Sequence, residues 1–146
     1  MRRIDIIAAG KMRAGPLSDL WDEYRKRVKW PVTLIEVEGR NAAEEQRKLG
    51  EKIESSAFLF ALDEKGKSLR SADFASKLEK LAVEGQSHIQ FVIGGADGLD
   101  ESLRKKARFL LSFGSQTWPH MLVRVMLMEQ LYRARQIIDG HPYHRE

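Results

Sequence analysis

The sequence lacks cysteine altogether among its 146 residues. That absence excludes disulfide bonds, a thiol nucleophile and thiolate metal ligands, and it fits a cytoplasmic protein. Long apolar runs are also missing, since no stretch approaches the ~20 residues that a membrane helix needs. Near the amino terminus, Asp5 interrupts an apolar segment already too short for an export signal, so a buried first strand is favoured there. We therefore expect a soluble, cytoplasmic protein with no membrane partner.

The composition and charge narrow the class of protein. With 42% hydrophobic and 32% charged residues, the chain is typical of a globular protein. A chain of this length forms one domain, residues 1–146, and buries roughly 70% of its unfolded surface on folding. The net charge of +4 and the pI of about 9.4 favour a polyanionic partner, with nucleic acid preferred.

Five short apolar segments alternate with stretches of helical period, and they lie at residues 4–9, 32–37, 58–63, 89–93 and 109–113. Most are too continuously apolar for a sheet with one solvent-facing side, which indicates parallel strands covered on both faces. Right-handed crossovers between such strands place helices on both faces and the working loops at the carboxyl ends. The predicted fold class is therefore α/β, with a mostly parallel sheet flanked by helices.

Two of the expected helices make specific predictions. Asn41 and Glu44 have the spacing of a capping box, which predicts a helix that opens there and continues through Ser56. The last helix, from about residue 121 to residue 139, is apolar around most of its circumference in its first half. One sheet face does not need so much apolar surface, so this helix predicts a second burial partner, such as another copy of the chain. Its three methionines are explained better by core packing than by a ligand surface.

Two glycine-containing segments imitate nucleotide-binding loops without matching them. The sequence GKS at residues 66–68 resembles the end of a P-loop, but the earlier glycine of that motif would fall on Ala61, inside a strand. The sequence GGADG at residues 94–98 follows a strand and precedes a helix, yet it lacks the spacing of a dinucleotide fold. Its glycines fit either a close approach of the backbone to a ligand or a plain turn.

The histidines do not predict a metal site. His141 and His144 are three residues apart, but metal sites usually need a third ligand. The other two histidines, His88 and His120, have no obvious place beside them. We therefore expect no bound metal.

Basic residues gather toward the carboxyl end. The last predicted helix carries three arginines, Arg124, Arg133 and Arg135. Glu129 stands four residues before Arg133, and that pair by itself fits a solvated salt bridge. The tail adds further basic and aromatic residues, namely Tyr143, His144 and Arg145. Arginines and tail together could form a phosphate-binding patch with an aromatic platform, a combination that single-stranded RNA elements favour.

Five segments carry a family resemblance over essentially the whole chain: IDIIAAGK, LDEKGK, FVIGGADGL, WPHMLVRVMLMEQLYRA and the closing HPYHRE. In these segments and in their order the chain resembles the RlmH family, SPOUT-class methyltransferases that modify pseudouridine in large-subunit ribosomal RNA. The resemblance implies a fold whose carboxyl-terminal chain passes through a loop to form a deep trefoil knot, with S-adenosylmethionine bound in it. It also implies an obligate homodimer with each site at the subunit interface.

The resemblance places the cofactor residues at the carboxyl ends of predicted strands. By position they fall on Leu62, Gly94 and a loop that consists of Phe113, Gly114, Ser115, Gln116, Thr117 and Trp118. Open α/β sheets keep their ligands at this edge, so the argument from topology and the resemblance agree.

The reaction implied by the resemblance is methylation of N3 of pseudouridine 1915, in helix 69 of 23S rRNA, on assembled ribosomes. The catalytic residues are then Arg133 and, in the tail, Tyr143, His144 and Arg145. We expect Tyr143 to stack on or orient the base, and the arginines to hold phosphates. His144 would hydrogen-bond the uracil edge or assist proton removal.

The partners implied are a second copy of the chain, the ribosome and 23S rRNA, and not DNA. Two alternatives stay open: a SPOUT methyltransferase that acts on a different RNA, and a ribosome-binding factor that has lost catalysis. A tail that simply caps the fold is a further interpretation of HPYHRE.

Overall fold

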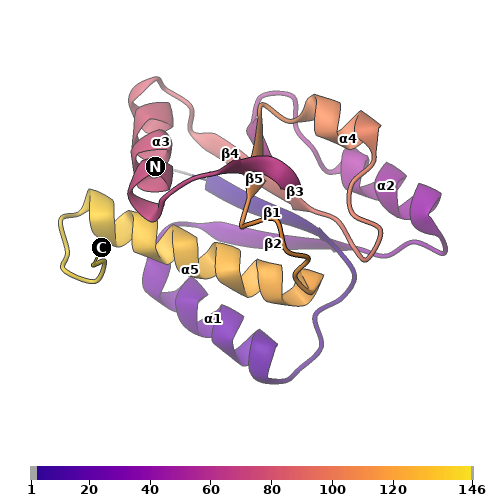
Figure 1. Ribbon diagram of the computed structural model, residues 1–146, viewed down its shortest axis with the longest axis horizontal. Helices are drawn as coiled ribbons and strands as arrows, with labels where there is room; N and C mark the ends of the chain where they lie inside the picture. Colours follow the sequence, from indigo (N-terminus) through magenta and orange to yellow (C-terminus); the bar gives the residue numbers. More distant parts are fainter. Residues whose placement is uncertain (1–2, 146) are drawn as a thin grey trace.

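A five-stranded sheet forms the centre of the protein. The structure is a computed structural model that describes residues 3–145 (Figure 1). In space the strands follow the order β2-β1-β4-β3-β5, with bounds Arg3–Ala9 for β1, Val32–Val37 for β2, Phe58–Ser68 for β3, His88–Ile93 for β4 and Phe109–Ser112 for β5. Every neighbouring pair is parallel. The predicted α/β class and parallel sheet are therefore confirmed.

Each predicted strand is present, and one is longer than predicted. After a register shift between Leu62 and Lys67, β3 pairs with β5 a second time, which carries the strand past Asp63 to Ser68. In this second stretch Lys67 lies opposite Leu111. The extension consists of polar residues without an apolar run, so only the pairing with β5 reveals it.

Helices cover both faces of the sheet (Figure 1). The core on one face draws on α1 (Pro16–Val28), α3 (Ser71–Val83) and α5 (His120–Ile138), and the core on the other draws on α2 (Ala42–Glu51) and α4 (Glu101–Lys106). Residues of β1 pack into both cores: Ile4 and Ile6 lie in the first core, and Ile7 and Ala9 lie in the second. Burial of each isoleucine contributes about 1.5–3 kcal/mol. This two-sided burial explains why the strands are apolar without alternation.

The helix that begins after Asn41 ends earlier than predicted. The Asn41 side chain accepts a hydrogen bond of 2.9 Å from the Glu44 N–H, as the capping box predicts. The helix stops at Glu51 and not at Ser56. The buried amide of Gln90 accounts for this end, because it donates to the Lys52 carbonyl at 3.1 Å and accepts from the Glu54 N–H at 2.8 Å. Hydrogen bonds from a β4 residue therefore end the helix at a point where the local sequence would allow it to continue.

The last helix, α5, is buried along one side and partly open on another. Its fully buried apolar residues are Val125, Leu127, Met128, Leu131 and Ala134. Leu122 and Met126 are only half-buried, and they line a groove of about 600 Å³ together with Leu20 and Tyr24 of α1. The prediction of core packing is thus confirmed for Met128, whereas Met126 faces the groove. Among residues 3–145, no helix is both long and apolar enough to cross a membrane.

Candidate functional site

The segments predicted to bind the cofactor lie at one edge of the sheet. Leu62 lies on β3 opposite Leu111 of β5. Gly94 follows the last residue of β4, and residues 113–118 follow β5. Because β4, β3 and β5 are parallel neighbours, their carboxyl ends lie side by side. The structure therefore brings together three segments that are distant in the sequence.

The loop after β5 is tethered at both ends. The Ser112 hydroxyl lies 2.9 Å from the Gly114 carbonyl oxygen and accepts a hydrogen bond of 3.0 Å from the Gly114 N–H. The Thr117 hydroxyl donates to the Glu64 carboxylate at 3.2 Å. Gly114 has a φ of +116°, a conformation that glycine adopts without strain. These contacts hold the loop against the extended part of β3.

The same loop presents both polar and apolar groups to its surroundings. Residues 115–118 are exposed, and Trp118 is 39% exposed although its indole donates to the Phe113 carbonyl at 3.3 Å. Leu62, on the neighbouring strand, is half-buried. A tethered loop with exposed backbone beside apolar side chains suits a ligand that has a flat heterocycle and a polar tail.

The GGADG segment forms a tight turn. The Gly98 N–H donates to the Gly95 carbonyl at 3.0 Å, and Gly98 has a φ of +70°. A Cβ on Gly94 would lie 2.4 Å from the Gly98 carbonyl oxygen, so no side chain fits there. Of the two interpretations that the sequence left open, a turn is sufficient to explain Gly94 and Gly98.

A glutamine from α2 holds this turn in place. Gln46 donates to the Gly98 carbonyl at 2.9 Å and accepts from the Asp100 N–H at 3.0 Å. Asp100 in turn caps α4 by accepting from the Leu103 N–H. The sequence analysis missed Gln46, because its contacts join segments 52 and 54 residues apart and a glutamine in a helix carries no local signal.

The carboxyl-terminal tail packs against α5. The rings of Tyr143 and Tyr132 meet edge to face, with their centroids 4.6 Å apart. The Arg133 guanidinium lies over the Tyr143 ring, 4.9 Å from its centroid, and its Nη1 is 3.0 Å from His144 Nδ1. Arg145 is exposed. The structure thus brings together Arg133, Tyr143 and His144, three of the four predicted catalytic residues.

The hydrogen bonds indicate the protonation of the tail. An arginine only donates, so His144 Nδ1 is the acceptor, and the proton of the neutral ring lies on Nε2. The Tyr143 hydroxyl donates to Glu129 at 3.1 Å. Burial and the adjacent Glu129 carboxylate raise the pKa of Tyr143 to about 12, so the phenol keeps its proton at neutral pH. The hydrogen bond to Glu129 also raises the pKa of Arg133.

The expected patch of three arginines does not form, and that prediction is wrong. Arg124 has a fully buried side chain, which pairs with Glu36 at 2.7 Å and donates to two backbone carbonyls. Arg135 pairs with Asp139 at 2.9 Å and lies over another aromatic ring, away from the tail. Of the three, Arg133 alone contacts the tail residues described here. Helical spacing turns the other two toward different neighbours.

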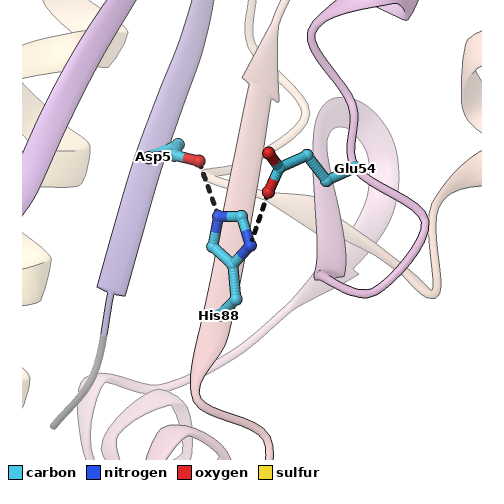
Figure 2. A group of neighbouring side chains, drawn as sticks. All are labelled: Asp5, Glu54 and His88. Atoms are coloured by element: carbon cyan, nitrogen blue, oxygen red, sulfur yellow. Dashed lines mark hydrogen bonds and ion pairs between the residues drawn. The ribbon is translucent and has the colours of Figure 1, made fainter.

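His88 lies between two carboxylates and not beside the tail histidines (Figure 2). Its Nε2 is 2.6 Å from Asp5 and its Nδ1 is 2.9 Å from Glu54. The Arg3 guanidinium is 3.7 Å from the Asp5 carboxylate and 3.8 Å from that of Glu54. A single metal ion would need both carboxylates at the same ring nitrogen, and Arg3 would repel it. The cluster is therefore an ion-pair network at the amino ends of β1 and β4.

Within one chain, the tail packs on α5, the helix that the loop after β5 enters. The loop leads into the first residue of α5, whereas the tail contacts Glu129 and Arg133 further along the same helix. At 1.5 Å per residue, these contacts are roughly 14–20 Å along the helix axis from its start. Figure 1 shows the carboxyl end and the loop near opposite ends of α5. Phe113 and Gly114 of the loop nevertheless line the same groove as Glu129, which accepts a hydrogen bond from Tyr143 of the tail.

A comparison with protein families identifies the fold. A family model described as "Predicted SPOUT methyltransferase" matches residues 2–144. The chain belongs to the SPOUT methyltransferase family. The predicted SPOUT class is thereby confirmed.

Curated relatives place the chain more narrowly within the SPOUT family. It is 51% identical over 150 residues to "Ribosomal RNA large subunit methyltransferase H" of Rhodospirillum centenum, with 98% of this chain and 99% of that protein covered. It is 43% identical over 158 residues to the protein of the same name from Bradyrhizobium diazoefficiens, with the same coverage of both. The resemblance to the RlmH family is therefore confirmed over nearly the full length of the chain.

Solved structures support the SPOUT fold alone. A probable methylase family protein from Haemophilus influenzae gives a TM-score of 0.63 at 11% identity, with 99% of this chain and 71% of that chain covered. The tRNA (m1G37) methyltransferase of Aquifex aeolicus gives a TM-score of 0.59 at 14% identity, with 99% and 76% covered. At such identities the shared fold carries no information about the substrate.

Proposed function

We propose that this SPOUT protein methylates N3 of a pseudouridine in helix 69 of 23S rRNA, on assembled ribosomes, with S-adenosylmethionine as the methyl donor. The observation that carries the proposal is the convergence of Leu62, Gly94 and residues 113–118 at one sheet edge in a chain 51% identical to a ribosomal RNA methyltransferase. The basic, aromatic tail supplies a second group that suits RNA.

The residues at the sheet edge fit S-adenosylmethionine. Leu62 and Trp118 offer apolar surface to the adenine, and the exposed backbone of residues 115–118 offers hydrogen-bonding groups to its edge. Gly94 and the turn that Gln46 holds would form the neighbouring wall. Bound there, the cofactor would supply an electrophilic methyl group on a sulfonium.

The tail residues can do what the methylated nitrogen requires. N3 of pseudouridine is an imide nitrogen that carries a proton at neutral pH, so the site must favour loss of that proton. His144, which lies 3.0 Å from the Arg133 guanidinium, would hydrogen-bond the uracil edge or assist removal of that proton. Arg133 and Arg145 would hold phosphates, and Tyr143 would orient the base. Alignment of the nitrogen with the methyl group can lower the activation free energy by up to roughly 7–11 kcal/mol more.

A homodimer is part of this proposal, because the family resemblance implies one. In it, the tail of one copy would approach the cofactor loop of another. The groove between α1 and α5, with Leu20, Tyr24, Leu122 and Met126 in its lining, supplies the apolar surface for such a contact. The proposal also includes a trefoil knot formed by the carboxyl-terminal chain. It places the protein in the cytoplasm of a bacterial cell.

The deciding experiment is methyl transfer from labelled S-adenosylmethionine to ribosomes that lack the modification, with mass spectrometry to locate the product. Label on the helix 69 pseudouridine is the expected result. Label on another nucleotide would favour a different RNA target, and ribosome binding without label would favour a non-catalytic factor. A free stem-loop should be methylated far more slowly than ribosomes, because a chain this small has little surface to recognise sequence.

The tail roles have their own test. Replacement of Tyr143, His144 and Arg145 by alanine should abolish methylation while S-adenosylmethionine binding, measured by calorimetry, is unchanged. Unchanged methylation by this variant would show that the tail merely caps the fold.

A further inference from the structure

We propose that Glu129 is a positioning residue of the methylation site, which holds Arg133 and Tyr143 in the arrangement that receives the target nucleotide. The inference rests on the proposed function. Glu129 lies on α5, and its side chain is 17% exposed, so the pair with Arg133 is not the solvated salt bridge that the sequence allowed.

One oxygen of the Glu129 carboxylate, Oε1, contacts both Arg133 and Tyr143. Glu129 Oε1 accepts hydrogen bonds from Arg133 Nε at 2.9 Å and Nη2 at 2.6 Å. The same atom accepts from the Tyr143 hydroxyl at 3.1 Å. Hydrogen bonds to an ionised acceptor are about twice as strong as neutral ones. A single atom therefore sets the positions of two of the residues assigned to RNA.

The other oxygen is linked through Gln130 to a different helix. Glu129 Oε2 accepts from the Gln130 amide at 3.0 Å, and the Gln130 carbonyl oxygen accepts from the Ser71 hydroxyl at 2.7 Å. Ser71 is the first residue of α3. The carboxylate is thus oriented by the body of the protein, so its direction does not depend on the tail. A residue that positions others is expected to be fixed in this way by hydrogen bonds of its own.

Arg133 keeps hydrogen-bonding capacity while Glu129 holds it. A guanidinium has five N–H donors. Two of them reach Glu129 and one reaches His144, so five minus three leaves two for a phosphate. Fixing the side chain in advance removes rotational freedom that substrate binding would otherwise have to restrict. Glu129 therefore prepares the arginine without saturating it.

The test compares Glu129→Gln with a matched variant on the same helix. Glu129→Gln keeps the size of the side chain and removes its charge, and kcat on ribosomes should fall on the order of 100-fold, as a small misplacement of reacting groups produces. Glu129→Asp should recover part of that loss. The control is Asp139→Asn, which removes the other i,i+4 pair of α5, with Arg135, and should leave kcat unchanged. S-adenosylmethionine affinity should be the same in all of these proteins.

A second readout does not require activity. Absorbance titration of the tyrosines, with Tyr143→Phe to assign the signal, should show that Glu129→Gln lowers the pKa of Tyr143 from about 12 toward 10.0. If the wild-type protein methylates no ribosomal RNA, the proposed function fails while this titration still tests the Glu129 contact. Wild-type kcat in Glu129→Gln, or an unchanged Tyr143 titration, would overturn the inference. Should Glu129→Gln not fold, Gln130→Ala loosens the same carboxylate, and a loss of about five-fold in kcat is expected.

Discussion

The Arg124 guanidinium lies 2.7 Å from the Glu36 carboxylate, although 88 residues separate the two in sequence. Arg124 Nη2 also donates to the carbonyl oxygens of Ala9 and Gly10, at 2.8 and 2.7 Å. Glu36 in turn accepts from the Met12 N–H at 2.6 Å. This pair joins α5 to the carboxyl ends of β1 and β2, so the helix that carries Glu129 and Arg133 is anchored to the sheet by a buried charge.

Glu36→Gln should lower the free energy of unfolding by about 3–5 kcal/mol, because it leaves a fully buried guanidinium without its counter-charge. Burial lowers the pKa of Arg124, and Glu36 opposes that shift. Urea denaturation measures the change. The control is Glu23→Gln, which removes an exposed i,i+4 pair with Arg27 and should cost no more than about 1 kcal/mol. Equal losses in the two variants would contradict a special role for the buried pair.

Asp5→Asn should be more destabilising than Glu54→Gln, although both carboxylates bond to the same His88 ring (Figure 2). Asp5 is 2% exposed and also accepts from Gln90 at 3.0 Å, so its loss leaves two buried donors with a poorer acceptor. We expect Asp5→Asn to lower the free energy of unfolding by about 2–3 kcal/mol. Glu54→Gln should lower it by less than about 1 kcal/mol, because the Glu54 side chain is 48% exposed. Thermal unfolding of the two variants checks the order, and the reverse order would refute it.

Gln46→Ala should weaken S-adenosylmethionine binding by up to about 30-fold, because each of its two hydrogen bonds to the turn at residues 94–100 contributes about 1 kcal/mol. Isothermal titration calorimetry measures the affinity. Arg47→Ala is the matched control, since the next side chain on α2 bonds to Glu51 and not to the turn. Unchanged affinity in Gln46→Ala would show that the turn keeps its shape without the glutamine.

Two glycine-to-alanine changes should have opposite signs. Gly94→Ala places a Cβ 2.4 Å from a backbone oxygen and should destabilise the protein by about 1–3 kcal/mol. Gly50 lies inside α2, and a Cβ there would meet its neighbours at an ordinary 3.5 Å. Gly50→Ala should therefore stabilise the protein by about 0.5–1 kcal/mol through helix propensity. Denaturant midpoints report both changes, and a stabilised Gly94→Ala protein would exclude the close turn.

The docking of Tyr143 should be sensitive to alkaline pH. The pKa of this phenol is raised from 10.0 to about 12 in the folded protein, so its contribution to stability is complete below about pH 10. As the pH rises from there through about 12, the unfolded chain loses the proton first, and the contribution disappears. The difference in unfolding temperature between the wild type and Tyr143→Phe should therefore shrink over this range. A constant difference would mean that the hydroxyl is not docked.

Local sequence patterns predicted which helices and strands form better than they predicted the residues at which those elements end. The five strands, their parallel direction and the cap at Asn41 follow from apolar runs and from residue spacing, which depend on neighbours in sequence. The end of α2 at Glu51 does not, because it depends on Gln90 of β4. The extension of β3 to Ser68 likewise depends on pairing with β5.

The candidate site shows the same division. The family resemblance selected Leu62, Gly94 and the loop after β5, and the apolar runs placed them at strand ends, which a parallel sheet sends to one edge. Neither showed that Gln46 holds the neighbouring turn, or that Arg124 is buried while Arg133 contacts the tail. Three arginines on one helix are alike in sequence, and only the neighbours that each side chain meets separate a structural charge from a residue that can hold RNA.

The sequence by itself determined the α/β class, the parallel sheet and the edge at which the segments after the strands meet, because apolar periodicity is a property of short segments. The tertiary structure decided which charges are buried, that Glu129 bonds to both Arg133 and Tyr143, and that the tail packs along α5. Those outcomes depend on distances between residues far apart in sequence, and such distances exist only once the chain has folded.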